Sequence, residues 1–146
     1  MSATHFRELE VWQVGMRLVH ATYELSAGFP REERYGLASQ LQRAAVSIPS
    51  NIAEGNARGS TRDYARFVAI AMGSCAELQT QLILSEDLRL GDAADRTTAL
   101  ELCDRVGQML LRLHQSLLRR LSESRVPSPE SRLPGSRISE PLEDYA

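Results

Sequence analysis

The side chains most capable of chemistry surround a proline in the stretch RAAVSIPSNIAEG, residues 43–55. Asn51 and Glu54 are the pair on which a hydrolase or a metal enzyme would be centred. A structural role competes with that chemistry, because Pro49 has no backbone N–H and frees carbonyls that nearby polar side chains can bond. The residues assigned to this kink and its polar support are Ser47, Pro49, Ser50, Asn51 and Glu54.

Phosphate binding is the second chemistry that this region suggests. At about 100° per residue, Arg43 and Arg58 fall on one narrow polar stripe of a helix. Arg62 and Arg66 follow one turn apart, where the exposed amides of a helix start also favour anions. The alternative is a solvated face in which Arg58 pairs with Glu54. The candidate nucleic-acid-binding residues are Arg43, Arg58, Arg62 and Arg66.

Motifs that would indicate catalysis do not occur in the sequence. The histidines are His5, His20 and His114, and none follows a glutamate by three residues, as the Glu-x-x-His pairs of a di-iron bundle would. GxSxG, HExxH, Walker and GxGxxG motifs are also missing. We therefore expect a non-enzymatic protein without catalytic residues, metal or cofactor.

Four helical segments account for most of the chain. The expected ranges are 6–25, 31–55, 61–90 and 93–121, and a glycine lies between each pair. Alternation at period two never persists, so no strand is expected. The pattern predicts an all-α fold.

The second helix is expected to continue through its proline. Its apolar residues recur every three or four positions on both sides of Pro49, so the phase is unbroken and one kinked helix is the simplest interpretation. The third helix should begin after Ser60, because a serine with Asp63 three residues later is close to a capping box. The apolar residues that set the phase of the second helix are Leu37, Leu41, Ala44, Ile48 and Ile52.

Length and charge indicate one domain, residues 1–121, and a separate tail, residues 122–146. A chain of 146 residues can bury one core. The domain has 14 arginines and 14 acidic residues, which argues against a strongly basic domain but allows a local basic patch. The tail is rich in proline and serine and is expected to be disordered.

Two apolar faces on the first helix favour a homo-oligomer. One face carries Trp12, Met16, Val19 and Tyr23, and the other lies about 200° away. A lone bundle needs one apolar stripe, so one face should meet another copy of the chain, and the sequence does not decide which. On the third helix a ridge of small residues suits either an interface or a close contact inside the protomer. The candidate interface residues are Val14, Leu18, Ala21, Leu25, Ala65, Ala69 and Gly73.

The two cysteines and the first residues of the chain indicate a cytoplasmic location. Cys75 and Cys103 lie in apolar helical patterns without metal-type spacing, so both are expected to be buried and reduced. The N-terminus lacks the pattern of a signal peptide, and no apolar run approaches the roughly 20 residues that span a bilayer. We expect no membrane partner.

Residues 6–120 resemble a known bacterial family. The stretches that carry the resemblance are LEVWQ at 9–13, YELS at 23–26, YGLASQLQRAAVSIPSNIAEG at 35–55 and FVAIAMGSCAELQTQL at 67–82. They are similar to the four-helix bundle proteins encoded by intervening sequences in 23S ribosomal RNA genes.

The resemblance implies an antiparallel up-down four-helix bundle that assembles into a ring-like homopentamer. A distant relative, the accessory variability determinant of diversity-generating retroelements, binds nucleic acid and a reverse transcriptase through a basic surface. By this analogy the leading hypothesis is an oligomeric scaffold, with RNA or DNA as partner. The alternatives are a protein–protein adaptor and, third, the hydrolase or metal enzyme introduced above.

Overall fold

The chain folds into four long helices that form a single bundle. The computed structural model describes residues 5–125, and within that range it contains no strand. The all-α prediction is therefore confirmed. The elements are the short 3₁₀ turns η1 (Phe6–Glu8) and η2 (Arg31–Glu33) and the helices α1 (Glu10–Ala27), α2 (Leu37–Ala57), α3 (Thr61–Asp87) and α4 (Ala93–Arg125).

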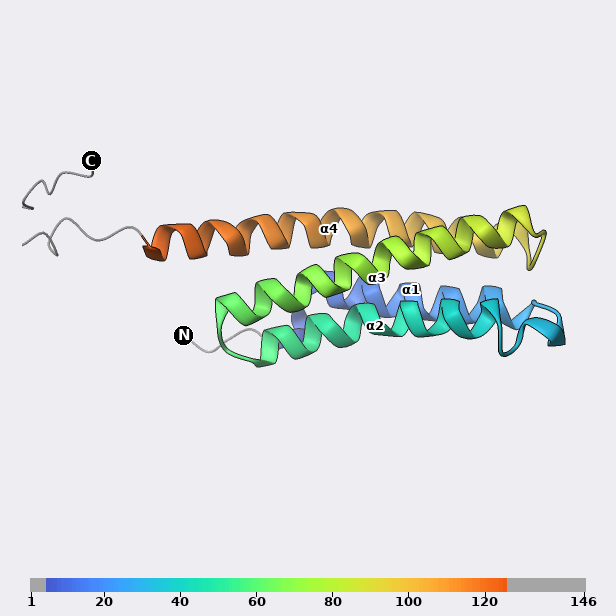
Figure 1. Cartoon of the computed structure of the whole chain (residues 1–146), viewed down its shortest axis with the longest axis horizontal. Coiled ribbons are helices and arrows are strands. Elements are labelled where there is room, and N and C mark those ends of the chain that lie inside the picture. The colour runs from blue at the N-terminus through green and yellow to red at the C-terminus, as the bar shows by residue number, and fades with distance from the viewer. Residues whose placement is uncertain (1–4, 126–146) are drawn as a thin grey trace, which may run out of the picture.

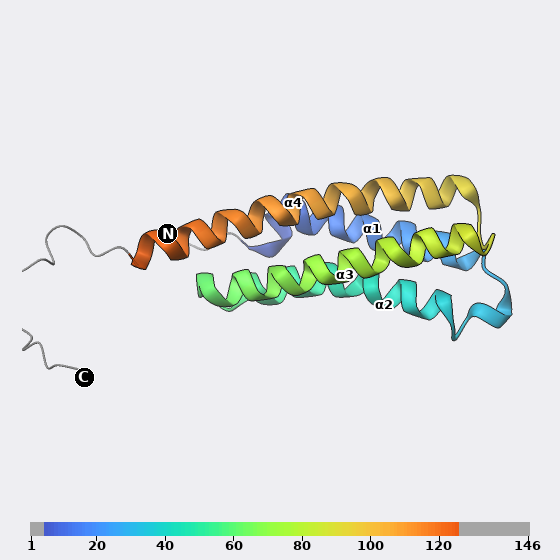
Figure 2. The same cartoon turned by 45° about the horizontal axis from the view of Figure 1, so that its top comes forward.

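The helices run alternately up and down, as the resemblance implies (Figures 1 and 2). Each helix packs on its neighbours along the chain, and α1 packs on α4 to close the bundle. No Cα atoms of α1 and α3 lie within 8 Å of each other, so these two helices lie on opposite corners of the bundle. The α2–α3 turn, the start of α1 and the end of α4 therefore meet at one end of the molecule.

Helix α2 continues through Pro49, as its apolar spacing predicts. The helix is unbroken from Leu37 to Ala57, and its apolar stripe of leucine, alanine and isoleucine side chains is buried on both sides of the proline. Pro49 is buried too, and it faces Gly15 of α1. A Cβ atom at Gly15 would lie 3.7 Å from the Cβ of Pro49, an ordinary van der Waals distance, so α1 accommodates the pyrrolidine ring without strain.

Several helix bounds differ from the predicted ones, with the largest differences at the starts of α1 and α2 and at the ends of α3 and α4; α3 ends at Asp87 rather than at residue 90. Residues 6–8 and 31–33 form 3₁₀ turns, Leu9 is extended and residues 34–36 form a turn, so α1 starts at Glu10 and α2 starts at Leu37. Helix α4 continues to Arg125, past the predicted domain boundary at residue 121. Leu121 is still half-buried against the core, which accounts for the extension. Residues 122–125, assigned to the disordered tail, are therefore helical, and residues 126–146 lie outside the described residues.

The structure decides which face of α1 is core. Val14, Leu18 and Leu25 are at most 2% exposed within the protomer, so the assignment of these three residues to a subunit interface was wrong. Ala21 is half-buried beside α4. Ala65 of α3 is also a core residue, which removes it from the candidate interface.

The other α1 face and most of the α3 ridge point outward. Trp12, Met16 and Val19 are half-buried at the surface, and Tyr23 is exposed. Ala69 and Gly73 of α3 are exposed, as are the neighbouring side chains Ala76, Ile70 and Ile83.

The start of α3 is capped as the sequence predicts, and the cap has a measurable contribution. The Ser60 hydroxyl accepts a hydrogen bond of 3.0 Å from the Asp63 N–H. A Ser60→Ala substitution is expected to lower the free energy of unfolding by about 1 kcal/mol, because that amide loses its partner. Urea denaturation followed by circular dichroism would measure the change. Ser60→Asp retains an acceptor and should stay close to the parent, whereas equal losses in both variants would contradict a capping role.

Candidate functional site

The four candidate arginines do not form one patch. Arg58, Arg62 and Arg66 lie together at the α2–α3 turn, because the turn joins the end of one helix to the start of the next. Arg43 lies 15 residues before Arg58 on α2, which places it about 22 Å away along the helix. It borders a separate groove with Ser47, Ser74 and Glu77. The predicted patch is thus reduced to three arginines, with Arg43 elsewhere.

The arginines at the turn are arranged around one aromatic ring. The guanidinium carbons of Arg58 and Arg66 each lie 5.1 Å from the centre of the Phe67 ring, which is within cation–π range. Arg58 also pairs with Glu54 at 3.0 Å, as the alternative interpretation predicted, and Arg66 approaches Asp63 at 3.9 Å. These contacts hold two of the cations in place while leaving both side chains exposed to solvent.

Arg62 is the arginine of this group with the most freedom to bind an anion. It is exposed on the first turn of α3, and the ion pairs found in residues 5–125 do not include it. The turn itself depends on Gly59, whose φ of +76° is unfavourable for other residues. The end of α2 and the start of α3 can therefore lie close together with the arginines projecting outward.

The polar side chains around Pro49 serve the α2–α3 contact. The Ser47 and Ser74 hydroxyl oxygens are 2.8 Å apart across the two helices. The Asn51 amide nitrogen donates to the Ser47 carbonyl at 2.7 Å and to the Ser47 hydroxyl at 3.0 Å. Pro49 has no N–H to offer the Ala45 carbonyl four residues earlier, so the predicted supporting role would have a polar side chain donate to that carbonyl. Asn51 donates to the carbonyl of Ser47 instead. Ser50 is exposed and borders an apolar groove.

Asn51 and Glu54 do not converge on a shared site. The Asn51 amide is turned into the α2–α3 contact, whereas the Glu54 carboxylate is held by Arg58 at the surface. Within the described residues no three His, Cys, Asp or Glu side chains are grouped to hold a metal ion. These positions therefore give the hydrolase or metal-enzyme hypothesis no geometric support.

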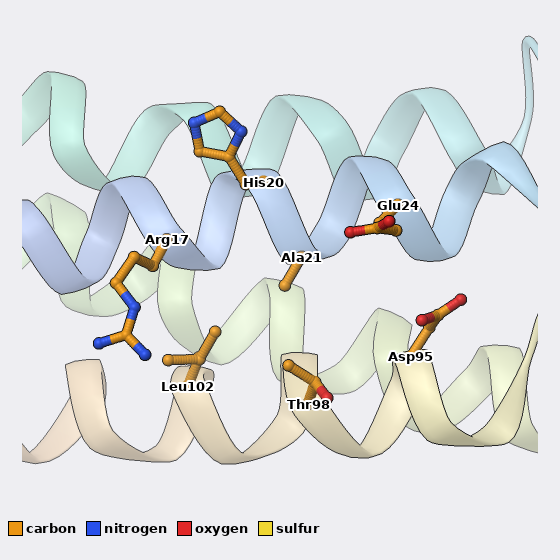
Figure 3. Close-up of a pocket in the computed structure, with 7 residues that line it drawn as sticks. All are labelled: Arg17, His20, Ala21, Glu24, Asp95, Thr98 and Leu102. Carbon is orange, nitrogen blue, oxygen red and sulfur yellow. The ribbon is translucent and has the colours of Figure 1, made fainter.

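A polar groove of about 470 Å³ lies between α1 and α4 (Figure 3). Arg17, His20 and Glu24 approach it from α1, and Asp95 and Thr98 approach it from α4. Figure 3 shows the His20 ring pointing away from the α4 side chains. In the part of the chain that the structure describes, no hydrogen bond or ion pair joins these five residues to one another.

A second groove, of about 340 Å³, is almost entirely apolar and lies between α1 and α2. Its lining combines the outward face of α1 with the residues around the proline of α2. A surface of this kind on a protomer often marks a contact with another protein. The residues that line it are Trp12, Met16, Val19, Val46, Pro49, Ser50 and Ala53.

The two cysteines face each other across α3 and α4. Both are buried and free, as predicted, and their Sγ atoms are 3.6 Å apart. The Cys75 thiol donates to the Cys103 carbonyl at 3.3 Å. The hydrogen bond with Cys75, together with burial, holds the pKa of the Cys103 thiol well above its usual range, so this sulfur stays protonated. The pair joins two core helices and is not exposed as a nucleophile.

The sequence did not reveal the roles of three further arginines, Arg96 and the pair Arg119 and Arg120. Arg96 is buried, and it donates to the Ser85 hydroxyl at 3.0 Å and to the Leu90 carbonyl, so it ties the start of α4 to the end of α3. Arg119 and Arg120 are exposed near the end of α4, which the up-down order brings to the same end of the bundle as the α2–α3 turn. If the predicted helices had been placed side by side in antiparallel order, the end of the fourth helix would have fallen beside the turn between the second and third, and Arg119 and Arg120 would have been identified.

Helix α3 is more apolar than the sequence analysis expected. By length and composition it is the one helix in the described residues that meets the limits for a membrane span, with a mean hydropathy of 1.4. In the bundle 39% of that window is buried, and core helices of soluble proteins meet the same limits. Of the other apolar residues of α3, Tyr64 and Met72 are half-buried against the core, whereas Ala69, Ile70, Ala76, Ile83 and Leu84 are exposed.

Comparison with known proteins assigns the chain to a family. Curated proteins provide no match. The family model described as 23S rRNA-intervening sequence protein matches residues 7–112, which include the four helices up to the last part of α4. This match agrees with the resemblance carried by the stretch around Pro49. The chain is a member of the 23S rRNA-intervening sequence protein family.

Proposed function

We propose that this protein is a non-enzymatic, oligomeric scaffold that binds RNA or DNA through the arginines at its α2–α3 turn. The observation that carries the proposal is the exposed group of Arg58, Arg62 and Arg66 around Phe67, placed where the free amides of the α3 start also favour phosphate. Arg43 lies too far along α2 to join this contact. We place the protein in the cytoplasm, where nucleic acid is available.

Oligomerisation is supported by two different apolar surfaces on opposite corners of the protomer. One is the groove between α1 and α2, and the other is the exposed face of α3 around Gly73 and Ile83. An interface that joins two different surfaces repeats head to tail, and it closes into a ring when the rotation permits. A ring-like homopentamer, the assembly that the family resemblance implies, satisfies this requirement.

The nucleic-acid proposal is tested by the salt dependence of binding. A fluorescent 20-nucleotide RNA and the matching single-stranded and duplex DNA would be titrated with protein at several salt concentrations, with anisotropy as the readout. The double variant Arg58→Gln/Arg62→Gln is expected to bind about tenfold more weakly at low salt and to lower the slope of log affinity against log salt by about 1–2.

The matched control removes two exposed arginines from the other end of the bundle. Arg31→Gln/Arg34→Gln changes the net charge equally and should leave the affinity close to that of the parent. If the parent binds neither RNA nor DNA at low salt, or if its binding does not change with salt, the nucleic-acid proposal is wrong.

A protein–protein adaptor is the second candidate function. It is favoured by the groove between α1 and α2, whose exposed lining is almost wholly apolar. An adaptor would retain a specific protein partner after nuclease treatment and would lose it when Met16, in the middle of the groove, is changed to glutamate. Loss of the partner on nuclease treatment alone would favour the scaffold instead.

A further inference from the structure

The two ends of the bundle carry opposite charge. The chain has nearly equal numbers of basic and acidic residues, yet positive and negative side chains lie mostly at different ends of the helices. At the end that holds the α2–α3 turn, named the basic end, arginines outnumber acidic residues, and at the other end the reverse is true. The residues of the basic end are Arg7, Arg58, Arg62, Arg66, Arg112, Arg119, Arg120 and Arg125 with Glu8, Glu10, Glu54, Asp63 and Glu123, and those of the acidic end are Glu24, Glu32, Glu33, Glu86, Asp87, Asp92 and Asp95 with Arg31, Arg34, Arg89 and Arg96.

Helix α4 adds the largest number of arginines to the basic end. Figures 1 and 2 show its last turns beside and beyond the start of α3. Arg119 and Arg120 are exposed there, and neither belongs to an ion pair found in the described residues. Arg120 lies close enough to Tyr64 of α3 to act on it: burial raises the pKa of the Tyr64 phenol, and the positive charge of Arg120 works in the opposite direction. Arginines of α4 and α3 thus share one region of space.

Helix stability explains only part of this arrangement. Cations in the last turn of a helix interact favourably with its dipole, which suits Arg125 of α4 but does not reach Arg119 and Arg120, more than one turn earlier. Arg62 lies in the first turn of α3, where the same dipole opposes positive charge, and Arg66 lies one turn later. The repulsion between the two groups adds to that cost. The two unfavourable interactions are that of the α3 dipole with positive charge and the repulsion between the two groups of arginines. A bound polyanion would attract both the helix start and the arginines, so it would offset both costs.

We propose that Arg119 and Arg120 of α4 extend the arginines of the α2–α3 turn into one phosphate-binding surface across the basic end, and that this surface holds the backbone of a nucleic-acid strand. The inference rests on the proposed function and adds to it a further helix, α4, so that the surface extends from the α2–α3 turn toward the end of α4. Contacts of arginine with phosphates position a strand without reading its sequence, so binding should be insensitive to base composition.

Cyclic symmetry extends the same surface over an assembly. Rotation about one axis leaves the position of each protomer along that axis unchanged, so equivalent ends of every protomer lie at the same height. When the bundles stand along the axis, all basic ends gather on one face of a ring. A strand would then contact several protomers in turn, which raises its apparent affinity beyond that of a single site.

The test compares three double variants of the full chain with the anisotropy assay and the RNA and DNA probes described above. Arg119→Gln/Arg120→Gln is expected to weaken binding about tenfold at low salt and to lower the salt slope by about 1–2, similarly for probes of different base composition. Arg119→Lys/Arg120→Lys keeps the charge and should restore most of the affinity. Arg31→Gln/Arg34→Gln, at the acidic end, should match the parent. Circular dichroism would establish that each variant is helical.

The outcomes separate this inference from the function on which it rests. If Arg58→Gln/Arg62→Gln weakens binding while Arg119→Gln/Arg120→Gln matches the acidic-end control, the α4 arginines are not part of the surface and the inference is overturned. If the parent binds no probe at low salt, both the inference and the proposed function fail. A stronger loss for RNA than for DNA, or the reverse, identifies which nucleic acid the surface takes.

Discussion

A Gly55→Ala substitution is expected to lower the free energy of unfolding by about 1–3 kcal/mol, although alanine normally stabilises a helix interior relative to glycine by about 1 kcal/mol. A Cβ atom at Gly55 would lie 2.7 Å from the Cβ of Phe67 and 3.3 Å from the Cδ1 of Tyr64. Both neighbours are anchored near the α3 backbone, so α2 and α3 must separate to make room. Urea denaturation at fixed protein concentration would measure the loss.

Gly15→Ala is the matched control for this substitution. A Cβ at Gly15 would have its nearest neighbour, the Cβ of Pro49, at 3.7 Å, which is an ordinary van der Waals distance. The control should therefore be neutral or more stable than the parent, because only the helix propensity changes. Equal effects at the two positions would contradict the close approach of α2 and α3 at Gly55. The same approach sets the spacing of the arginines around Phe67.

For the oligomer proposed above, a Gly73→Glu substitution is expected to dissociate the assembly into protomers. Gly73 is exposed on α3, and a Cβ there would meet no heavy atom within 4 Å, so the protomer itself can accept a larger side chain. A carboxylate buried between two subunits would lose its hydration without gaining a partner. Light scattering should give the parent a mass several times the 16.3 kDa of one chain and the variant a mass close to one chain.

The control for charge alone is Gln115→Glu on the exposed side of α4. It should keep the mass of the parent. If Gly73→Glu also keeps that mass, the exposed face of α3 is not the interface, and a parent that is itself a single chain would contradict oligomerisation.

Local patterns were sufficient to predict the four helices and the cap at the start of α3. The continuity of α2 through Pro49 follows from an apolar repeat that keeps its phase. The repeat is set by residues three or four positions apart, and these residues are buried on both sides of the proline. The Ser60 cap is equally local, since its acceptor and donor are three residues apart. Such features need no knowledge of the tertiary fold.

Features that depend on neighbouring helices could not be predicted in the same way. The two faces of α1 are similarly apolar, so only the packing of α2 and α4 reveals that Leu18 lies inside and Met16 lies at the surface. Arg43 shares a helical stripe with Arg58, but a stripe does not define a site when its members are several turns apart. Arg120 lies far from Arg62 in the sequence, and only the up-down order brings their helices together at one end.

The last turn of α4 has a dynamic consequence. Residues 122–125 are all exposed, so this turn lacks the buried contacts that hold the rest of the helix in the bundle. Terminal turns of this kind open and close locally without unfolding the core, on a timescale that amide hydrogen exchange can follow. Arg125, the basic-end arginine that lies in this turn, can therefore adjust to the path of a strand while the α2–α3 turn stays fixed, and ordering it on binding would cost conformational entropy.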